Sequence, residues 1–121
     1  METSSRSGST SDTPGWLVKD GVVLASLEVV GGRAAKARGL LGRDGIDGVL
    51  VLEGVRSVHT FGMRFDIDVV FCDGEGRILR TLTVPRWRVT RPVPKAARAL
   101  EAEAGSVERW GLAVGDRVEF L

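Results

Sequence analysis

The run Ile67-Asp68-Val69-Val70-Phe71 constrains the fold more than any other part of this sequence. A strand that is buried on both faces reads as a near-continuous apolar run, whereas a strand with one wet face alternates polar and apolar residues. The run therefore predicts a central strand of a sheet. Its one charged residue, Asp68, needs a partner inside the protein, because an unpaired buried charge is unfavourable.

Shorter apolar runs on both sides of this strand predict further strands, most of them antiparallel. A hairpin turn is expected at Asp20-Gly21, a dipeptide that favours tight turns, and a second one at 73–76. The second hairpin would place Asp68 and Arg80 on neighbouring strands, within reach of each other. The expected strands cover 16–19, 22–30, 49–52, 67–71, 77–84, 99–104 and 117–121.

Two short helices are expected among these strands. Alanine-rich residues 33–41 favour a helix, and Ser106 is suited to cap another that runs to Trp110. Residues 85–94 contain three prolines and predict a long surface loop, because proline lacks a backbone donor for a sheet. Short strands, Gly-rich turns and little helix together predict a mainly β domain, built as a sandwich or a barrel.

Length and composition limit the domain organisation and the cellular setting. The 121 residues allow one domain, expected over 15–121, and the Ser-, Thr- and Gly-rich residues 1–14 predict a disordered tail. No apolar run reaches the roughly 18 residues of a membrane span, and no signal peptide is evident, so a cytoplasmic location is expected. The single cysteine, Cys72, excludes an intrachain disulfide and fits a reducing compartment.

The formal charge of +1 comes from 17 basic and 16 acidic side chains. Such a balance gives no overall attraction to nucleic acid or to an anionic membrane, so neither partner is expected. A small polar or anionic ligand remains compatible with the sequence, because local patches of charge do not depend on the total. The sequence does not indicate an oligomeric state.

Several short motifs occur in an order that resembles the domain-of-unknown-function 192 family, over about 24–121. The motifs are Gly39-Leu40-Leu41-Gly42-Arg43, Ile67-Asp68-Val69-Val70-Phe71, Leu100-Glu101, Gly105 and Gly115-Asp116. The resemblance implies a compact β-sandwich-like domain, with no established reaction. It also implies that Arg43, Asp68, Glu101 and Asp116 matter, whereas residues 59–63 depart from the family's Trp-Met-x-Asn-Thr stretch and inherit no role.

Four residues are candidates for contact with a ligand: Arg43, His59, Asp68 and Glu101. His59 is the only histidine, and an imidazole can serve as a general base or a metal ligand near neutral pH. A zinc site would need three or four ligands, and the available side chains show no diagnostic spacing, so no metal or other cofactor is expected. His59 could instead pack structurally, hydrogen-bonded to a carboxylate or a backbone group.

The charged candidates have two interpretations. Arg43 and Asp68 could form a buried ion pair extended by Glu101, which would be purely structural. Alternatively, these residues and His59 could line a polar pocket in which Arg43 holds a carboxylate or phosphate.

Three functional hypotheses follow. The first is a domain that binds a small anionic ligand or a partner segment near His59. The second is a hydrolase that uses His59 with Asp68 or Glu101, although no nucleophile is evident. The third is an interaction module that uses Trp87 and Arg88 of a basic, aromatic loop, or an edge strand.

Overall fold

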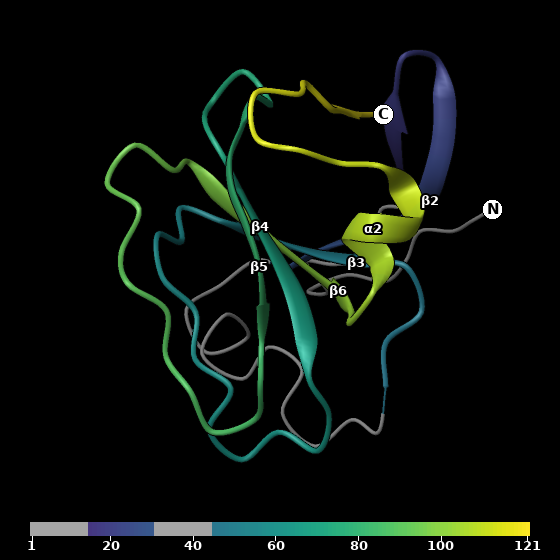
Figure 1. Cartoon of the computed structure of the whole chain (residues 1–121). Coiled ribbons are helices and arrows are strands. Elements are labelled where there is room, and N and C mark those ends of the chain that lie inside the picture. Colours follow the sequence, from purple (N-terminus) through teal and green to yellow (C-terminus); the bar gives the residue numbers. More distant parts are fainter. Residues whose placement is uncertain (1–14, 31–44) are drawn as a thin grey trace, which may run out of the picture.

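The fold is a single curled sheet of seven strands, shown in the computed structural model of Figure 1, which describes residues 15–30 and 45–121. The order across the sheet is β5-β4-β6-β3-β2-β1-β7. The strands are β1 (Gly15–Lys19), β2 (Val22–Val30), β3 (Val49–Glu53), β4 (Ile67–Cys72), β5 (Ile78–Val84), β6 (Arg98–Glu103) and β7 (Glu119–Phe120). The predicted tail over 1–14 and the predicted helix over 33–41 lie outside the described residues.

The prediction of a central strand at Ile67 is confirmed. β4 pairs with β5 on one side and β6 on the other, and all six of its residues are buried. The hairpin between β1 and β2 is also confirmed, with Asp20 and Gly21 at positive φ in its turn. β2 and β3 are parallel, and the other strand pairs are antiparallel.

The C-terminal segment brings the two ends of the sheet together. β7 pairs with β1, while residues 115–118 just before it hydrogen-bond to the start of β5. The Val118 N–H donates to the Gly76 carbonyl at 2.9 Å, and the Ile78 N–H donates to the Asp116 carbonyl at 2.8 Å. In Figure 1 this yellow segment runs from α2 past the β4–β5 hairpin and returns to β1. Of the two forms that the sequence left open, the sheet has the barrel-like one.

Each side of the sheet has its own hydrophobic core. One side, here called the loop face, packs β4 residues Val69 and Phe71 against the loops over 54–66 and 85–96. The other side, the helix face, packs Val70 and Cys72 against α2 (Ser106–Trp110) and the C-terminal segment. Because neighbouring residues of a strand point to opposite faces, β4 supplies both cores.

The predicted helix at Ser106 is confirmed, but its predicted cap is wrong. Gly105 occupies the N-cap position with a φ of 97°, and no side chain of the helix itself caps it. The carboxylate of Asp68 takes that role from β4, as described below. Gly111 ends α2 in a left-handed conformation. α2 is the one helix among residues 15–30 and 45–121.

The expected proximity of Asp68 and Arg80 is also wrong. Asp68 is opposite Thr83, and Arg80 is opposite Phe71, whose side chain is on the other face. The reason lies in the turn, where the Asp73 carboxylate accepts hydrogen bonds from the N–H groups of Glu75 and Arg77. A bulge next to this turn, between Phe71 and Cys72, then shifts the register.

The described part of the chain contains no helix with the length and hydropathy needed to span a bilayer.

Candidate functional site

Four exposed side chains from two separate loops form a continuous surface, here called the aromatic surface: His59, Phe61, Trp87 and Val89. The loop over 54–66 carries the first two, and the loop over 85–96 carries the others. An isolated antiparallel bridge joins His59 to Val89, so the two loops lie side by side. The aromatic surface thus exists only in the folded protein.

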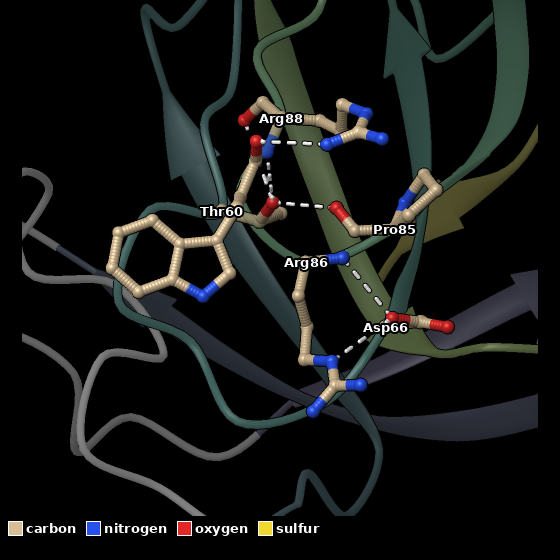
Figure 2. Close-up of polar contacts among 6 residues, drawn as sticks. Thr60, Asp66, Pro85, Arg86 and Arg88 are labelled. Atoms are coloured by element: carbon tan, nitrogen blue, oxygen red, sulfur yellow. Dashed lines mark hydrogen bonds and ion pairs between the residues drawn. The ribbon is translucent and has the colours of Figure 1, made fainter.

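Thr60 holds the two loops together at this point. Its side chain is fully buried, and its hydroxyl donates a hydrogen bond to the Pro85 carbonyl at 2.6 Å. The same hydroxyl accepts one from the Arg88 N–H at 2.9 Å, as Figure 2 shows. The backbone of Thr60 adds two more bonds: its N–H donates to the Arg88 carbonyl, and its carbonyl accepts from the Trp87 N–H. One residue thus fixes three residues of the second loop, Pro85, Trp87 and Arg88, through these four hydrogen bonds.

Thr90 repeats this arrangement two residues further along. Its hydroxyl accepts a hydrogen bond from the Val58 N–H at 2.9 Å, and its own N–H donates to the Val58 carbonyl at 2.8 Å. At the other end, Asp66 accepts a hydrogen bond from the Arg86 N–H at 3.1 Å, also visible in Figure 2. The buried Thr60 and Thr90, together with the half-exposed Asp66, thereby position the exposed rings.

Trp87 has a backbone conformation that is uncommon for its residue type. Its φ is 63°, in the left-handed region that L-residues other than glycine, asparagine and aspartate rarely occupy. Such a conformation costs on the order of 1–3 kcal/mol and persists only where surrounding contacts enforce it. Here the enforcing contacts are those of Thr60, and they leave the indole 61% exposed.

The exposed rings contact one another rather than the core. The ring centroids of His59 and Phe61 are 5.3 Å apart with an interplanar angle of 24°, and those of Phe61 and Trp87 are 6.3 Å apart. Phe61 is 46% exposed and Val89 is 62% exposed. Aromatic pairs favour such separations, and rings that are already ordered lose little entropy when a partner covers them.

Asp68 is buried on the helix face, where its carboxylate accepts three hydrogen bonds. Its Oδ1 accepts a hydrogen bond from the Thr83 hydroxyl at 2.6 Å. Its Oδ2 accepts from the N–H groups of Gly105 at 3.0 Å and Val107 at 2.9 Å. Because the first N–H groups of a helix have no partner within the helix, this carboxylate caps α2 from a neighbouring strand. The predicted need of Asp68 for an internal partner is thus met.

Glu101 is buried on the opposite face from Asp68. In β6 it lies between Leu50 and Val69, both of which belong to the core of the loop face. The sheet therefore separates the two carboxylates that the sequence had grouped as one possible pocket. Arg43 lies outside the described residues, so its predicted ion pair with Asp68 stays a prediction.

His59 lies apart from Asp68, on the exposed part of the loop face. Its contacts are the stacked ring of Phe61 and the backbone of Val89. Of the predicted site residues, the structure brings His59, Trp87 and Arg88 together and leaves Asp68 and Glu101 elsewhere. Asp116, which the family resemblance had singled out, forms an ion pair with Lys19 at 3.0 Å and accepts a hydrogen bond from the Ala113 N–H. These two contacts lower the pKa of the Asp116 carboxyl.

A cavity lies at the far end of the barrel from β4 residue Ile67, between the β4–β5 turn and the C-terminal segment. It has a volume of about 630 Å³, and its lining includes Arg98, Arg117 and Phe120. The Arg98 guanidinium stacks over the Phe120 ring at 4.6 Å and donates to Glu53 at 3.3 Å. The described ligand candidates His59, Asp68 and Glu101 do not line this cavity.

The surroundings of the single thiol do not favour thiol chemistry. Burial raises the pKa of the Cys72 thiol to about 12, so the nucleophilic thiolate is scarce at neutral pH. Within the described ranges, no three His, Cys, Asp or Glu side chains gather where they could hold a metal ion.

The sequence reasoning missed Thr60, Phe61 and Thr90. The two threonines act through contacts with residues 25 to 32 positions away, and no spacing in the sequence reveals these. Phe61 is followed by a glycine and lies outside any periodic apolar run. This position is a sequence signal, although a weak one, that the ring is exposed in a loop.

Together, a curled seven-stranded sheet and two interlocked loops define a small β domain with an exposed aromatic surface. A family model for DUF192, described as "Uncharacterized ACR", matches residues 17–120. The chain belongs to the DUF192 family, in agreement with the resemblance noted from its motifs.

Curated relatives carry the name UPF0127 protein. One from Pyrococcus abyssi is 32% identical over 65 residues, which is 54% of this chain and 56% of that protein. One from Thermococcus gammatolerans is 31% identical over 64 residues, which is 53% of this chain and 42% of the relative. The matched region thus spans only about half the length of these relatives.

Two solved structures share the fold. A protein of Sinorhizobium meliloti 1021, provisionally assigned as a transcription regulator, has a TM-score of 0.76 at 22% identity, covering 93% of this chain and 98% of that one. A protein of unknown function from Novosphingobium aromaticivorans has a TM-score of 0.74 at 16% identity, covering 98% and 91%. At these identities the likeness concerns the fold alone.

Proposed function

We propose that this protein is a binding module that holds a segment of a partner protein on the aromatic surface. The observation that carries the proposal is the combination of exposed rings with a fixed backbone beneath them. Trp87 and Phe61 are exposed, yet the hydrogen bonds of Thr60 hold both loops in place.

This combination is what protein interfaces require. Tryptophan is among the residues most enriched at the energetic centre of interfaces, where it buries a large area. The entropy that side chains and loops lose when they become ordered works against binding. A surface that is already ordered before the partner arrives loses less entropy. A strained backbone at Trp87 further supports a functional role, because strain concentrates at functional sites.

The hydrolase hypothesis receives less support. His59 lies on the exposed loop face, while Asp68 accepts three hydrogen bonds on the helix face. A general base needs its partner within hydrogen-bonding reach, and Asp68 is on the other face of the sheet. The alternative partner, Glu101, is buried in β6 within the loop-face core, whereas His59 is exposed. A pocket for a small ligand at His59 likewise stays a prediction.

The test is a selection of peptides from a random displayed library on the immobilised protein. We expect peptides that bind the native protein and lose most of their affinity for Trp87→Ala and Phe61→Ala. Truncation of a central interface tryptophan commonly costs 2 kcal/mol or more, which is roughly a thirtyfold loss of affinity.

Trp16→Ala is the matched control. Trp16 is 51% exposed on β1, so its removal deletes a comparable exposed ring outside the aromatic surface. Peptides that bind all three variants equally well, or that depend on Trp16 instead, would show that the partner does not use the aromatic surface.

A cytoplasmic location is part of the same proposal. The lone Cys72 is buried and has no possible disulfide partner in the chain, which is in keeping with a reducing compartment. Cell fractionation with an antibody against the protein would test this, and recovery outside the cytoplasm would contradict it.

A further inference from the structure

The two loops that carry the aromatic surface are far more basic than the protein as a whole. Residues 54–66 and 85–95 hold five arginines and one lysine but a single acidic residue, so their formal charge is +5. The whole chain carries +1, and the remainder therefore carries −4. The basic side chains are Arg56, Arg64, Arg86, Arg88, Arg91 and Lys95.

Only part of this charge is neutralised within the loops. Asp66, their one carboxylate, is paired with Arg86, whose Nε is 3.7 Å from Oδ1. Arg88 donates from a guanidinium nitrogen to the Trp87 backbone carbonyl at 3.3 Å, a contact that leaves its charge in place. Arg91 is exposed next to Thr90, which anchors its loop.

From this arrangement we infer that the segment bound on the aromatic surface is a short acidic peptide with an apolar or aromatic residue among its carboxylates. The inference rests on the proposed function and names the chemistry of the partner. Guanidinium groups pair with carboxylates through two parallel hydrogen bonds, and the exposed Arg88 and Arg91 belong to the loop that carries Trp87. The apolar residue of the peptide would lie on Phe61, Trp87 and Val89.

The charge distribution favours a short acidic peptide over a nucleic acid. A single-stranded nucleic acid would also stack on aromatic rings and pair with arginines. It is a long polyanion, however, and the rest of the chain beyond the two basic loops has a formal charge of −4. A short peptide places all of its negative charge within the basic area.

The decisive measurement is fluorescence anisotropy with a labelled short peptide of Glu, Asp and Gly residues around one central Leu. We expect saturable binding that weakens as salt is added, because salt screens exposed charge pairs. The same peptide with Gln and Asn in place of its acids should bind at least about tenfold more weakly, which corresponds to 1.4 kcal/mol. The same peptide with Gly for Leu tests the apolar contact and should also lose affinity.

Variants of the protein show which arginines contribute to peptide binding. Arg88→Gln and Arg91→Gln should each weaken binding by about threefold, the size expected for a single exposed charge pair. Arg80→Gln is the matched control, since it lowers the net charge by the same amount from an exposed position on β5. An equal loss of affinity with Arg80→Gln would mean that only the total charge matters, and would overturn the inference.

Other occupants give distinct results. Tighter binding of an oligothymidylate than of the acidic peptide, lost in Trp87→Ala, would overturn the inference in favour of nucleic acid. A dimer in solution that dissociates in Trp87→Ala would identify a second copy as the occupant. If library selection yields neutral or basic peptides that depend on Trp87, the inference fails while the proposed function stands.

Discussion

Asp68 on the helix face and Trp87 on the loop face are used in opposite ways. Asp68 is charged, yet it is buried and saturated with hydrogen bonds from Thr83 and from the start of α2. Trp87 is apolar, yet it is held in solvent by a strained backbone. A charged residue therefore completes the fold, and an apolar one is available for binding. Residue type alone would have assigned these roles the other way round.

The largest effect is expected for Asp68→Ala, which tests the structural half of this comparison. It leaves the N–H groups of Gly105 and Val107 and the Thr83 hydroxyl without their acceptor, so we expect a loss of about 4 kcal/mol in the free energy of unfolding. Equilibrium urea denaturation measures this. Thr83→Val removes only one of the donors and should cost less than half as much. A loss below about 1 kcal/mol for Asp68→Ala would show that water replaces the carboxylate.

Thr60→Val tests how firmly the loop face holds the aromatic surface. The variant keeps the shape of the side chain but leaves the Pro85 carbonyl and the Arg88 N–H without their buried partner. We expect a loss of about 3 kcal/mol in the free energy of unfolding, together with weaker peptide binding. Thr81→Val, on the half-buried part of β5, is the control. Unchanged peptide binding in a destabilised Thr60→Val protein would show that recognition does not require Thr60 to hold the two loops in place.

Gly76→Ala tests the contact between the C-terminal segment and the β4–β5 turn, with Gly74→Ala as its matched control. Gly76 has a φ of 86°, and an added Cβ would collide with the Val118 carbonyl oxygen, whereas a Cβ at Gly74 would meet nothing within 4 Å. Thermal unfolding should show a loss of about 2 kcal/mol for Gly76→Ala alone. Equal stability of the two variants would mean that the C-terminal segment shifts away from the added methyl group at little cost in free energy.

Trp87→Gly, compared with Trp87→Ala, should have the smallest effect, and in the stabilising direction. Both variants lack the indole, but only glycine accepts a φ of 63° without strain, so Trp87→Gly should be more stable by about 1 kcal/mol. Paired denaturation curves decide this, and both proteins should fail to bind peptide. An equal or lower stability of the glycine variant would indicate that the left-handed conformation carries no strain.

Local apolar runs were sufficient to predict most of the strands. β3 and β4 are buried along nearly their whole length, so their sequences are mostly apolar whatever their neighbours are. The register of β4 and β5 was not predictable in this way. It depends on the hydrogen bonds of Asp73 and on a bulge, which together displace Asp68 from Arg80 and place it opposite Thr83.

The candidate site was predictable only in part. His59 and Trp87 stood out by residue type, and the structure places them on one surface through Phe61. Glu101 and Asp68 stood out for the same reason, but the alternation of side chains across a sheet puts them on opposite faces. That separation depends on strand pairing over more than 30 residues, which no local pattern encodes.

The joining of the two sheet ends has a consequence for how the chain reaches its native state. Next to the β1–β7 pair, Trp16 and Leu121 exchange two backbone hydrogen bonds. Residues 115–118, just before β7, hydrogen-bond to the start of β5. Contacts between residues so distant in sequence form slowly, because a long loop must close before they contribute any stability. Until then the edges of β1 and β5 are open to pairing with other chains. Aggregation during refolding should therefore depend on protein concentration. It should increase in Gly76→Ala, in which the contact between the C-terminal segment and the β4–β5 turn is weakened.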